Sequence, residues 1–342
     1  MAEAKNRKRV AELGRGERVL ADPGRSVGVY RLRLPLPWPG VPHGNAWAVS
    51  AGEGIVLFDT GIHAPGSLAH LERALQMCGL ALGDVRLLVC THAHSDHYGQ
   101  AATIIERAGC ELWMHPNYAH MSRWAEDPDA SILRRLEIAR QSGVPEEPLR
   151  RYAAERTNHE SGIAAIVEPD RALVPGVVVD TDLGPWTVHE TPGHAPSHVC
   201  LFQPDRRLLI SGDHLLGRIS LYFDYGYSDD PVGEFVHSLD VVGGLQARLC
   251  LPGHGRTFAD VHAHIEGNRA LVAERLAAVL GVVTAGAGLT AFEILPRVYG
   301  ADLPPMLAQW LLTETLAMLL HLEVTGQATR IPGETERWSI PK

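Results

Sequence analysis

The chain has 342 residues, of which 45% are hydrophobic and 21% are charged. This length accommodates one large domain or two ordinary ones, and the composition is that of a soluble globular protein. The formal net charge is −9, from 40 acidic and 31 basic residues. That balance argues against nucleic acid as a partner, because a phosphate-binding surface is basic.

The cysteines and the first residues bear on the compartment. Five cysteines are an odd number and form no CxxC pair, so we interpret them as reduced packing residues of a cytoplasmic protein. Residues 1–26 are charged without an apolar core, which excludes a signal peptide and indicates a polar, loosely held arm. No segment reaches the roughly 18 uninterrupted apolar residues of a membrane span, so we expect no membrane partner.

The first predicted strands are 27–35, 46–50 and 54–58, where apolar residues alternate or form short runs. The intervening stretch 36–44 is rich in proline and glycine and is expected to be a loop. The third strand runs into Asp59. This carboxylate either forms a turn or accepts a hydrogen bond from a metal-binding histidine and so orients it.

A cluster of metal-ligand side chains follows, in the sequence Thr91-His92-Ala93-His94-Ser95-Asp96-His97. It comes directly after a predicted apolar strand at 85–90 and before a predicted helix at 98–108. Ligand sites of α/β proteins collect at such strand ends. Three imidazoles and one carboxylate within six residues therefore indicate a metal site rather than ordinary polar turn residues.

The spacing within this cluster favours two adjacent ions. His92 and His94 alternate like strand residues and can point the same way, whereas Asp96 and His97 lie in the turn. One segment can thus give each of two metals two ligands. More ligands must follow, because zinc takes four, or three and a water molecule.

Residues 118–165 change character, being charged and predicted helical at 131–142 and 147–160. We interpret this stretch as a helical insertion between strands. Two interpretations are open: a lid or substrate-specific wall near the site, and a solvated helical decoration.

Strands resume in the second half, and three of them end in a glycine followed by a ligand-type side chain: His194, Asp213 and His254. Glycine permits backbone conformations that let the next side chain project sharply from a strand end. The candidate metal ligands are His92, His94, Asp96, His97, His194, Asp213 and His254. Seven ligands suit a two-metal site that shares one carboxylate. Tyr222 and Tyr225 fall in the loop after Asp213 and either line the substrate pocket or pack within the loop.

The remainder, 258–342, is predicted to be a separate helical module with helices at 258–284, 290–299 and 305–323 and a short strand at 329–331. Two helices and a small β wing suggest a winged-helix-like shape, which often binds nucleic acid. The last helix carries too few lysine and arginine side chains to bind the phosphates of a nucleic acid. We therefore interpret the module as a packing or dimerisation element and keep a homodimer as a hypothesis.

In order and spacing, these motifs resemble the metallo-β-lactamase superfamily over residues 27–257. The segments that carry the resemblance are Thr91 to His97, Asp59-Thr60-Gly61, Pro192-Gly193-His194, Gly212-Asp213-His214 and Pro252-Gly253-His254-Gly255. The resemblance implies an α/β fold, an αββα sandwich with the metal site along one edge of two facing sheets. A ligand set that contains Asp96 and a bridging Asp213 resembles that of the glyoxalase II-like branch of the superfamily. The tail resembles the winged-helix-like extension of a lactamase-like branch.

The resemblance also implies roles for individual residues. It assigns His92, His94 and His194 to a first metal, Asp96, His97 and His254 to a second, and Asp213 to both. Asp96 would orient the nucleophile and accept its proton, and Asp59 would support a histidine ligand. Zinc fits these donors best, and iron or manganese is compatible.

The predicted function is a dinuclear metal-dependent hydrolase, in which a hydroxide shared by the two ions attacks a small acyl substrate, either a thioester or a lactone. The alternative is a metal-dependent endoribonuclease or phosphodiesterase of the same superfamily, with the tail binding RNA. A positive stripe beside the metals would favour that alternative.

Overall fold

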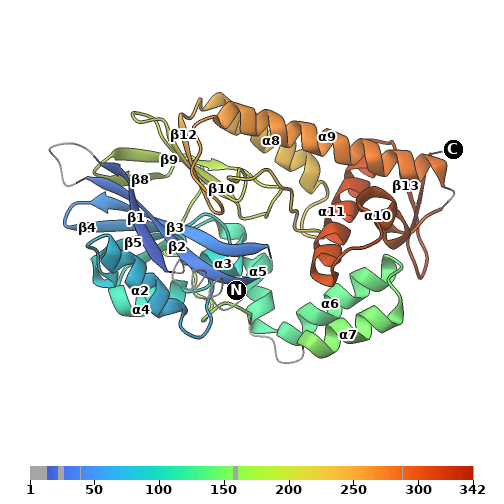
Figure 1. Ribbon diagram of the computed structural model, residues 1–342, viewed down its shortest axis with the longest axis horizontal. Helices are drawn as coiled ribbons and strands as arrows, with labels where there is room; N and C mark the ends of the chain where they lie inside the picture. Colours follow the sequence, from blue (N-terminus) through green and yellow to red (C-terminus); the bar gives the residue numbers. More distant parts are fainter. Residues whose placement is uncertain (1–13, 22–26, 39, 157–160, 287, 342) are drawn as a thin grey trace, which may run out of the picture.

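Two β-sheets face each other and carry helices on both outer sides in the computed structural model (Figure 1). The structure describes residues 14–21, 27–38, 40–156, 161–286 and 288–341. One apolar core lies between the sheets and one lies between each sheet and its helices. The predicted αββα sandwich is confirmed.

The first sheet has seven strands in sequence order. They are β1 (Arg15–Ala21), β2 (Gly28–Trp38), β3 (Val41–Ala51), β4 (Gly54–Phe58), β5 (Val85–Cys90), β6 (Glu111–Met114) and β7 (Arg171–Ala172). Strands β1 to β4 pair antiparallel, and β4 to β7 pair parallel. The carboxyl ends of β4 and β5 therefore lie at the same edge of the sheet.

The second sheet has five strands in the order β12-β11-β10-β9-β8. They are β8 (Val178–Thr181), β9 (Gly184–Glu190), β10 (Val199–Gln203), β11 (Leu208–Gly212) and β12 (Leu249–Pro252). Strands β11 and β12 are parallel, so their carboxyl ends also share an edge.

Side-chain alternation explains how the first sheet serves two cores. In β4, Ile55 and Leu57 pack toward helices α2 (Ser67–Met77) and α4 (Ala101–Ala108), whereas Val56 and Phe58 pack between the sheets. Successive residues of a strand point to opposite faces, so four consecutive apolar residues fill both layers. The Phe58 ring meets Trp186 of the facing sheet with ring centroids 5.7 Å apart. The second sheet is covered by α8 (Pro231–Gly244) and α9 (Val261–Ala285).

The region expected to be an insertion forms three helices, α5 (Ala119–Glu126), α6 (Pro128–Gln141) and α7 (Glu146–Arg156). The C-terminal module contains α10 (Ala291–Tyr299), α11 (Pro305–Val324) and the hairpin of β13 (Thr329–Ile331) and β14 (Arg337–Ser339). Figure 1 shows α6 and α7 beside α10 and α11. The amides of Phe292 and Glu336 donate to the carbonyls of Ser142 (3.0 Å) and Gln141 (2.8 Å). The insertion is therefore bonded to the C-terminal module, whose winged-helix likeness stays a prediction.

Two predictions for the first fifty residues are wrong. Residues 15–21 are not a loose arm, because they form β1 on the edge of the first sheet, where Glu17 pairs with Arg31 at 3.0 Å. The remainder of the predicted arm, 1–13 and 22–26, lies outside the described residues. The stretch 36–44 is not a loop, because β2 and β3 continue until Trp38 pairs with Val41. Pro37 falls where the register shifts, and a strand tolerates proline at such an irregularity.

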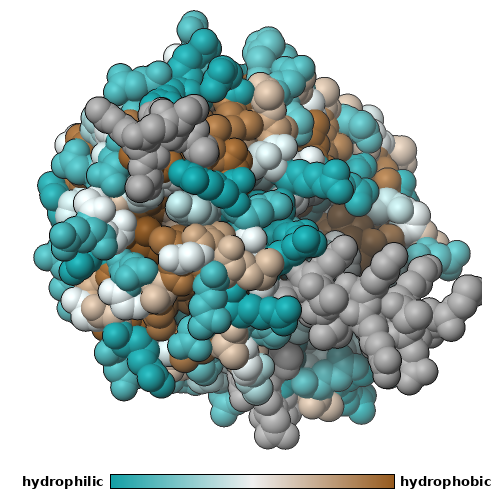
Figure 2. All heavy atoms as spheres, turned by 60° about the vertical axis from the view of Figure 1, so that its left-hand side comes forward, coloured by the Kyte–Doolittle hydropathy of each residue, from teal (hydrophilic) through white to brown (hydrophobic). Residues whose placement is uncertain are grey.

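Among the residues that the structure describes, no helix combines the length and the apolarity that crossing a bilayer requires. The face in Figure 2 mixes hydrophilic and apolar side chains, with the apolar ones gathered in small areas. Scattered apolar side chains are normal on a folded protein.

The contact between the two sheets generates a stability prediction. Trp186→Ala should lower the free energy of unfolding by about 3–5 kcal/mol, because it opens a cavity between the sheets. Urea unfolding followed by circular dichroism measures the change. Leu133→Ala, at a side chain that is 65% exposed on α6, should change it by less than about 0.5 kcal/mol. Equal effects of the two substitutions would contradict this account of the core.

Candidate metal centre

The loops that follow five strands bring their polar side chains to one edge of the sandwich. Asp59 follows β4, and the motif at 91–97 follows β5. His194, Asp213 and His254 follow β9, β11 and β12 of the second sheet. The structure brings all seven predicted ligand side chains into two groups that meet at Asp213.

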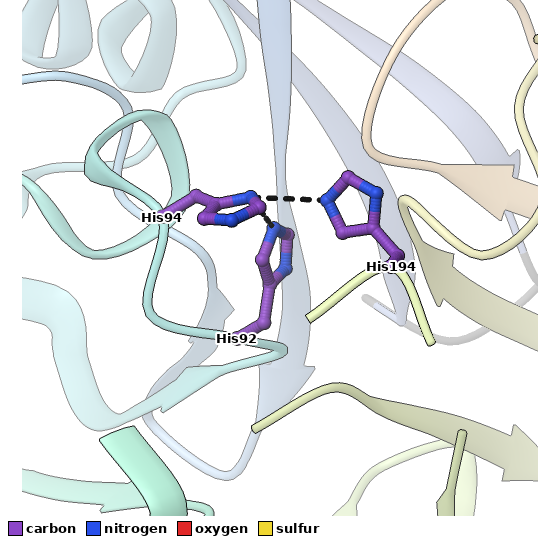
Figure 3. Close-up of side chains that lie close together, drawn as sticks. All are labelled: His92, His94 and His194. Atoms are coloured by element: carbon purple, nitrogen blue, oxygen red, sulfur yellow. Dashed lines mark hydrogen bonds between the residues drawn. The ribbon is translucent and has the colours of Figure 1, made fainter. Parts of the chain in front are cut away.

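Three ring nitrogens converge in the first group, as Figure 3 shows. His94 Nδ1 lies 3.0 Å from His92 Nε2 and 3.0 Å from His194 Nε2. A tetrahedral ion with bonds of about 2.0–2.1 Å to nitrogen places its ligand atoms roughly 3.3 Å apart. The three nitrogens are therefore close to the spacing that such an ion requires.

The second group joins two imidazoles to two carboxylates. His254 Nε2 lies 3.1 Å from Asp96 Oδ2 and 3.1 Å from Asp213 Oδ2. His97 Nε2 lies 3.4 Å from Asp96 Oδ2 and 3.3 Å from Asp213 Oδ1. Asp213 Oδ2 is also 3.7 Å from His194 Nε2, so this carboxylate faces both groups.

Two orphaned atoms show that these residues fit a cation. His97 Nε2 and Asp213 Oδ1 are buried and have no hydrogen-bond partner in the structure, although they face each other. Buried polar atoms are rarely left unpaired, and a bound ion is one of the reasons when they are. Nitrogen and oxygen donors in this arrangement suit a divalent metal such as zinc. We conclude that the residues present fit a divalent ion in each group.

Hydrogen bonds on the outer nitrogens hold the rings in place. His97 Nδ1 donates to Asp59 Oδ2 at 2.8 Å, and the Thr91 amide fixes the other oxygen of Asp59 at 2.8 Å. His254 Nδ1 lies 3.0 Å from the carbonyl oxygen of His43. A metal-binding histidine ordinarily donates its second ring nitrogen in this way, which fixes the tautomer and the ring orientation.

Burial and neighbouring charges shift the pKa values of individual rings in different directions, and in the first group the Asp224 carboxylate outweighs burial and raises the pKa of His94. Burial, reinforced by His94, lowers the pKa of His194 to about 4. Burial also lowers the pKa of His92 well below its ordinary value, so both rings are neutral near neutral pH. For His254, burial opposes protonation, but the carboxylates of Asp213 and Asp96 outweigh it and raise the pKa to about 10. The second group therefore carries a proton before metal binds.

The two tyrosines predicted for the pocket lie in different places. The Tyr222 ring is buried, with its centroid 5.8 Å from that of His94 and 5.4 Å from that of His194. Tyr225 packs against the core shared by α8, α9 and the C-terminal helices, so the structure does not bring it to the metal groups. The residues differ because an irregular loop has no periodicity from which to predict the direction of its side chains.

Asp224 was not predicted from the sequence. This carboxylate lies between the two tyrosines in the same loop, and its Oδ2 atom is 2.8 Å from His94 Nε2 and 3.3 Å from His120 Nε2. His120 lies on α5 and belongs to no motif. Neither residue follows a strand or a glycine in the ligand pattern, so no sequence signal pointed to either.

Comparison with known proteins agrees with this geometry. A family model described as the metallo-beta-lactamase superfamily matches residues 39–254. The chain is 27% identical over 251 residues to the probable metallo-hydrolase YqjP of Bacillus subtilis, covering 70% of this chain and 75% of that protein. It is 26% identical over 228 residues to the human acyl-coenzyme A thioesterase MBLAC2, covering 63% and 74%.

A solved structure extends the likeness to nearly the whole chain. The crystal structure of a beta-lactamase domain protein from Burkholderia ambifaria aligns with a TM-score of 0.82 and 26% identity, covering 96% of this chain and 95% of that one. The alignment thus includes the helical insertion and most of the C-terminal module. With the sandwich, the ligand geometry and a family match over more than half of its length, the chain belongs to the metallo-β-lactamase superfamily of hydrolases.

Proposed function

We propose that the protein is a dinuclear metal-dependent hydrolase of small acyl substrates, thioesters first and lactones second. The observation that carries the proposal is the meeting of two histidine–aspartate groups at one shared carboxylate, Asp213. The likeness to a protein named as an acyl-coenzyme A thioesterase supports the choice of a thioester.

The proposed ligands are divided between two ions. His92, His94 and His194 hold the first, Asp96, His97 and His254 hold the second, and Asp213 contacts both. Zinc suits the mixed nitrogen and oxygen donors, and iron or manganese is compatible with them. Divalent ions supply a nucleophile by lowering the pKa of water, and they polarise an acyl carbonyl.

Other groups of the chain then have defined tasks. Asp96 is proposed to orient the nucleophile and accept its proton, because its carboxylate lies beside His97 and His254 in the second group. These two rings outweigh burial and keep the pKa of Asp96 low, so the carboxylate is ionised and able to accept. Burial raises the pKa of Tyr222 above its ordinary value, so its hydroxyl stays protonated and can donate a hydrogen bond. With its ring against His94 and His194, Tyr222 is proposed to line the substrate pocket beside the first ion.

Removal of the shared carboxylate tests the two-metal proposal. Asp213→Ala should lose at least one bound metal ion and reduce turnover more than about 100-fold, because even residues that only support a ligand cost 10–100-fold. Metal content is measured by emission spectrometry and turnover with an acyl-thioester. Asp240→Ala, which removes an exposed carboxylate on α8, is the matched control and should change neither. Wild-type metal content and turnover in Asp213→Ala would contradict the proposal.

A substrate panel separates the acyl hydrolase from the phosphodiesterase alternative. Metal-loaded protein should hydrolyse acyl-thioesters or lactones faster than phosphodiesters or short RNA. Substrate binding should change little between about 50 and 200 mM salt, because a small acyl substrate does not present a series of phosphates to cationic side chains. Preferred cleavage of RNA with steeply salt-dependent binding would reverse the assignment.

The pKa of His254 predicts how zinc binding depends on pH. Zinc binds the neutral imidazole, whereas metal-free His254 keeps its proton up to about pH 10. Zinc binding near neutral pH should therefore release a proton, and the affinity should rise by about tenfold per pH unit for each proton released. Calorimetric titrations in buffers of different ionisation enthalpy count the protons. His254→Ala should release fewer protons, and an unchanged count would contradict the prediction.

A further inference from the structure

A buried carboxylate in the loop between β11 and α8 contacts the first metal group from outside. Resting on the metal centre proposed above, we infer that Asp224 is a positioning residue that fixes the His94 ring, and that His120 of α5 holds Asp224 in turn. The helical insertion would then be a structural part of the first metal site and not only a wall beside it.

Asp224 touches two of the three first-group histidines. Its Oδ2 atom is 2.8 Å from His94 Nε2, and its backbone amide donates to the carbonyl of His194 at 3.1 Å. The residue is only 8% exposed, so these bonds lie out of water, where they are strong and costly to lose. Asp224 thus contacts the side chain of His94 and the main chain of His194, which belong to the same group.

The arrangement indicates positioning rather than a third metal site. His94, His120 and Asp224 offer three atoms that lie close enough to hold an ion. His94 has only two ring nitrogens, however, and Nδ1 already faces His92 and His194 at 3.0 Å. An imidazole that ligates through Nδ1 carries its proton on Nε2, and that N–H then donates to the carboxylate. The 2.8 Å separation from Asp224 is that of a charge-assisted hydrogen bond.

The insertion braces this loop from two helices. His120 Nε2 faces Asp224 Oδ2 at 3.3 Å, an ion-pair distance without hydrogen-bond geometry, and the Asn117 carbonyl anchors its Nδ1 at 2.9 Å. Arg134 of α6 donates to the Gly226 carbonyl at 2.7 Å and lies over the Tyr227 ring at 4.6 Å. Figure 1 shows α5 leading from the sandwich toward α6 and α7. Residues of α5 and α6 therefore contact this loop at Asp224, Gly226 and Tyr227.

The second metal group has a counterpart with a different support. Asp59 fixes His97 as Asp224 fixes His94, but Asp59 follows strand β4 and is held by the Thr91 amide within the sandwich. A change in the insertion should therefore weaken the first ion selectively. This selectivity distinguishes positioning by the insertion from a general effect on folding.

Zinc affinity in a single-site background tests the inference. His254→Ala removes a proposed ligand of the second group only, so the zinc that remains reports on the first group. Into this background we would place Asp224→Asn, His120→Gln and both together. Competition with a chromophoric chelator gives the affinity, and circular dichroism with and without chelator checks folding. Glu314→Gln is the matched control, because Glu314 is another buried carboxylate, 6% exposed and bonded to Tyr299 in the C-terminal module.

Asp224→Asn should weaken zinc binding 10–100-fold, the usual effect of removing a partner of a ligating histidine. His120→Gln should weaken it less, and the double variant should be no weaker than Asp224→Asn, because His120 acts through Asp224. Glu314→Gln should leave the affinity unchanged in this background.

Three results would overturn the inference. Unchanged affinity in a folded Asp224→Asn protein would remove the role of Asp224, even if turnover fell. Additive losses in the double variant would show that His120 does not act through Asp224. An equal loss in Glu314→Gln would show a general effect of removing a buried carboxylate. A wild-type chain that binds no zinc would instead overturn the metal centre itself, and this inference with it.

Discussion

The structure depends on the burial of five imidazoles and two carboxylates at one edge of the sandwich, with 3.0 to 3.7 Å between neighbouring donor atoms. Burying polar groups without partners is costly. On the outer side, protein atoms such as Asp59 and the His43 carbonyl satisfy the rings. On the inner side His97 Nε2 and Asp213 Oδ1 remain unpaired. A cation would supply what the protein leaves open there, and metal binding would then be coupled to stability.

This constraint also explains why both sheets are needed. His254 belongs to the loop after β12 of the second sheet, but that loop is bonded to β3 of the first. Asn45 donates from its amide to the Gly253 carbonyl and from its side chain to Pro252, each at 2.7 Å, and Trp47 Nε1 donates to the same Pro252 carbonyl. Neither sheet alone holds both metal groups, so the site is a product of the packing of the sandwich.

The sequence predicted the residues whose chemistry is local. The motif at 91–97 and the glycine-preceded His194, Asp213 and His254 stand at strand ends, where periodicity and ligand type agree. Asp224 was missed because its role depends on His94 and His120, which reach it only through the fold. Strand β1 was missed for a similar reason. Its polar sequence has weak alternation, and it is a strand because it pairs along β2.

The contacts of the insertion favour one of the two interpretations that the sequence left open. A solvated decoration would make few contacts with the rest of the chain, but α6 is bonded to the loop that carries Tyr222 and Asp224 and to the C-terminal module. The loop that α5 and α6 brace carries Tyr222, against the first-group histidines, and Asp224, bonded to one of them. The loop between β11 and α8 therefore contains both Tyr222, which is proposed to line the pocket, and Asp224, which is proposed to support the first group. If Asp224 positions His94 as proposed, a sequence change in the insertion that reshapes the pocket would also act on the orientation of His94, which would link substrate choice to metal geometry.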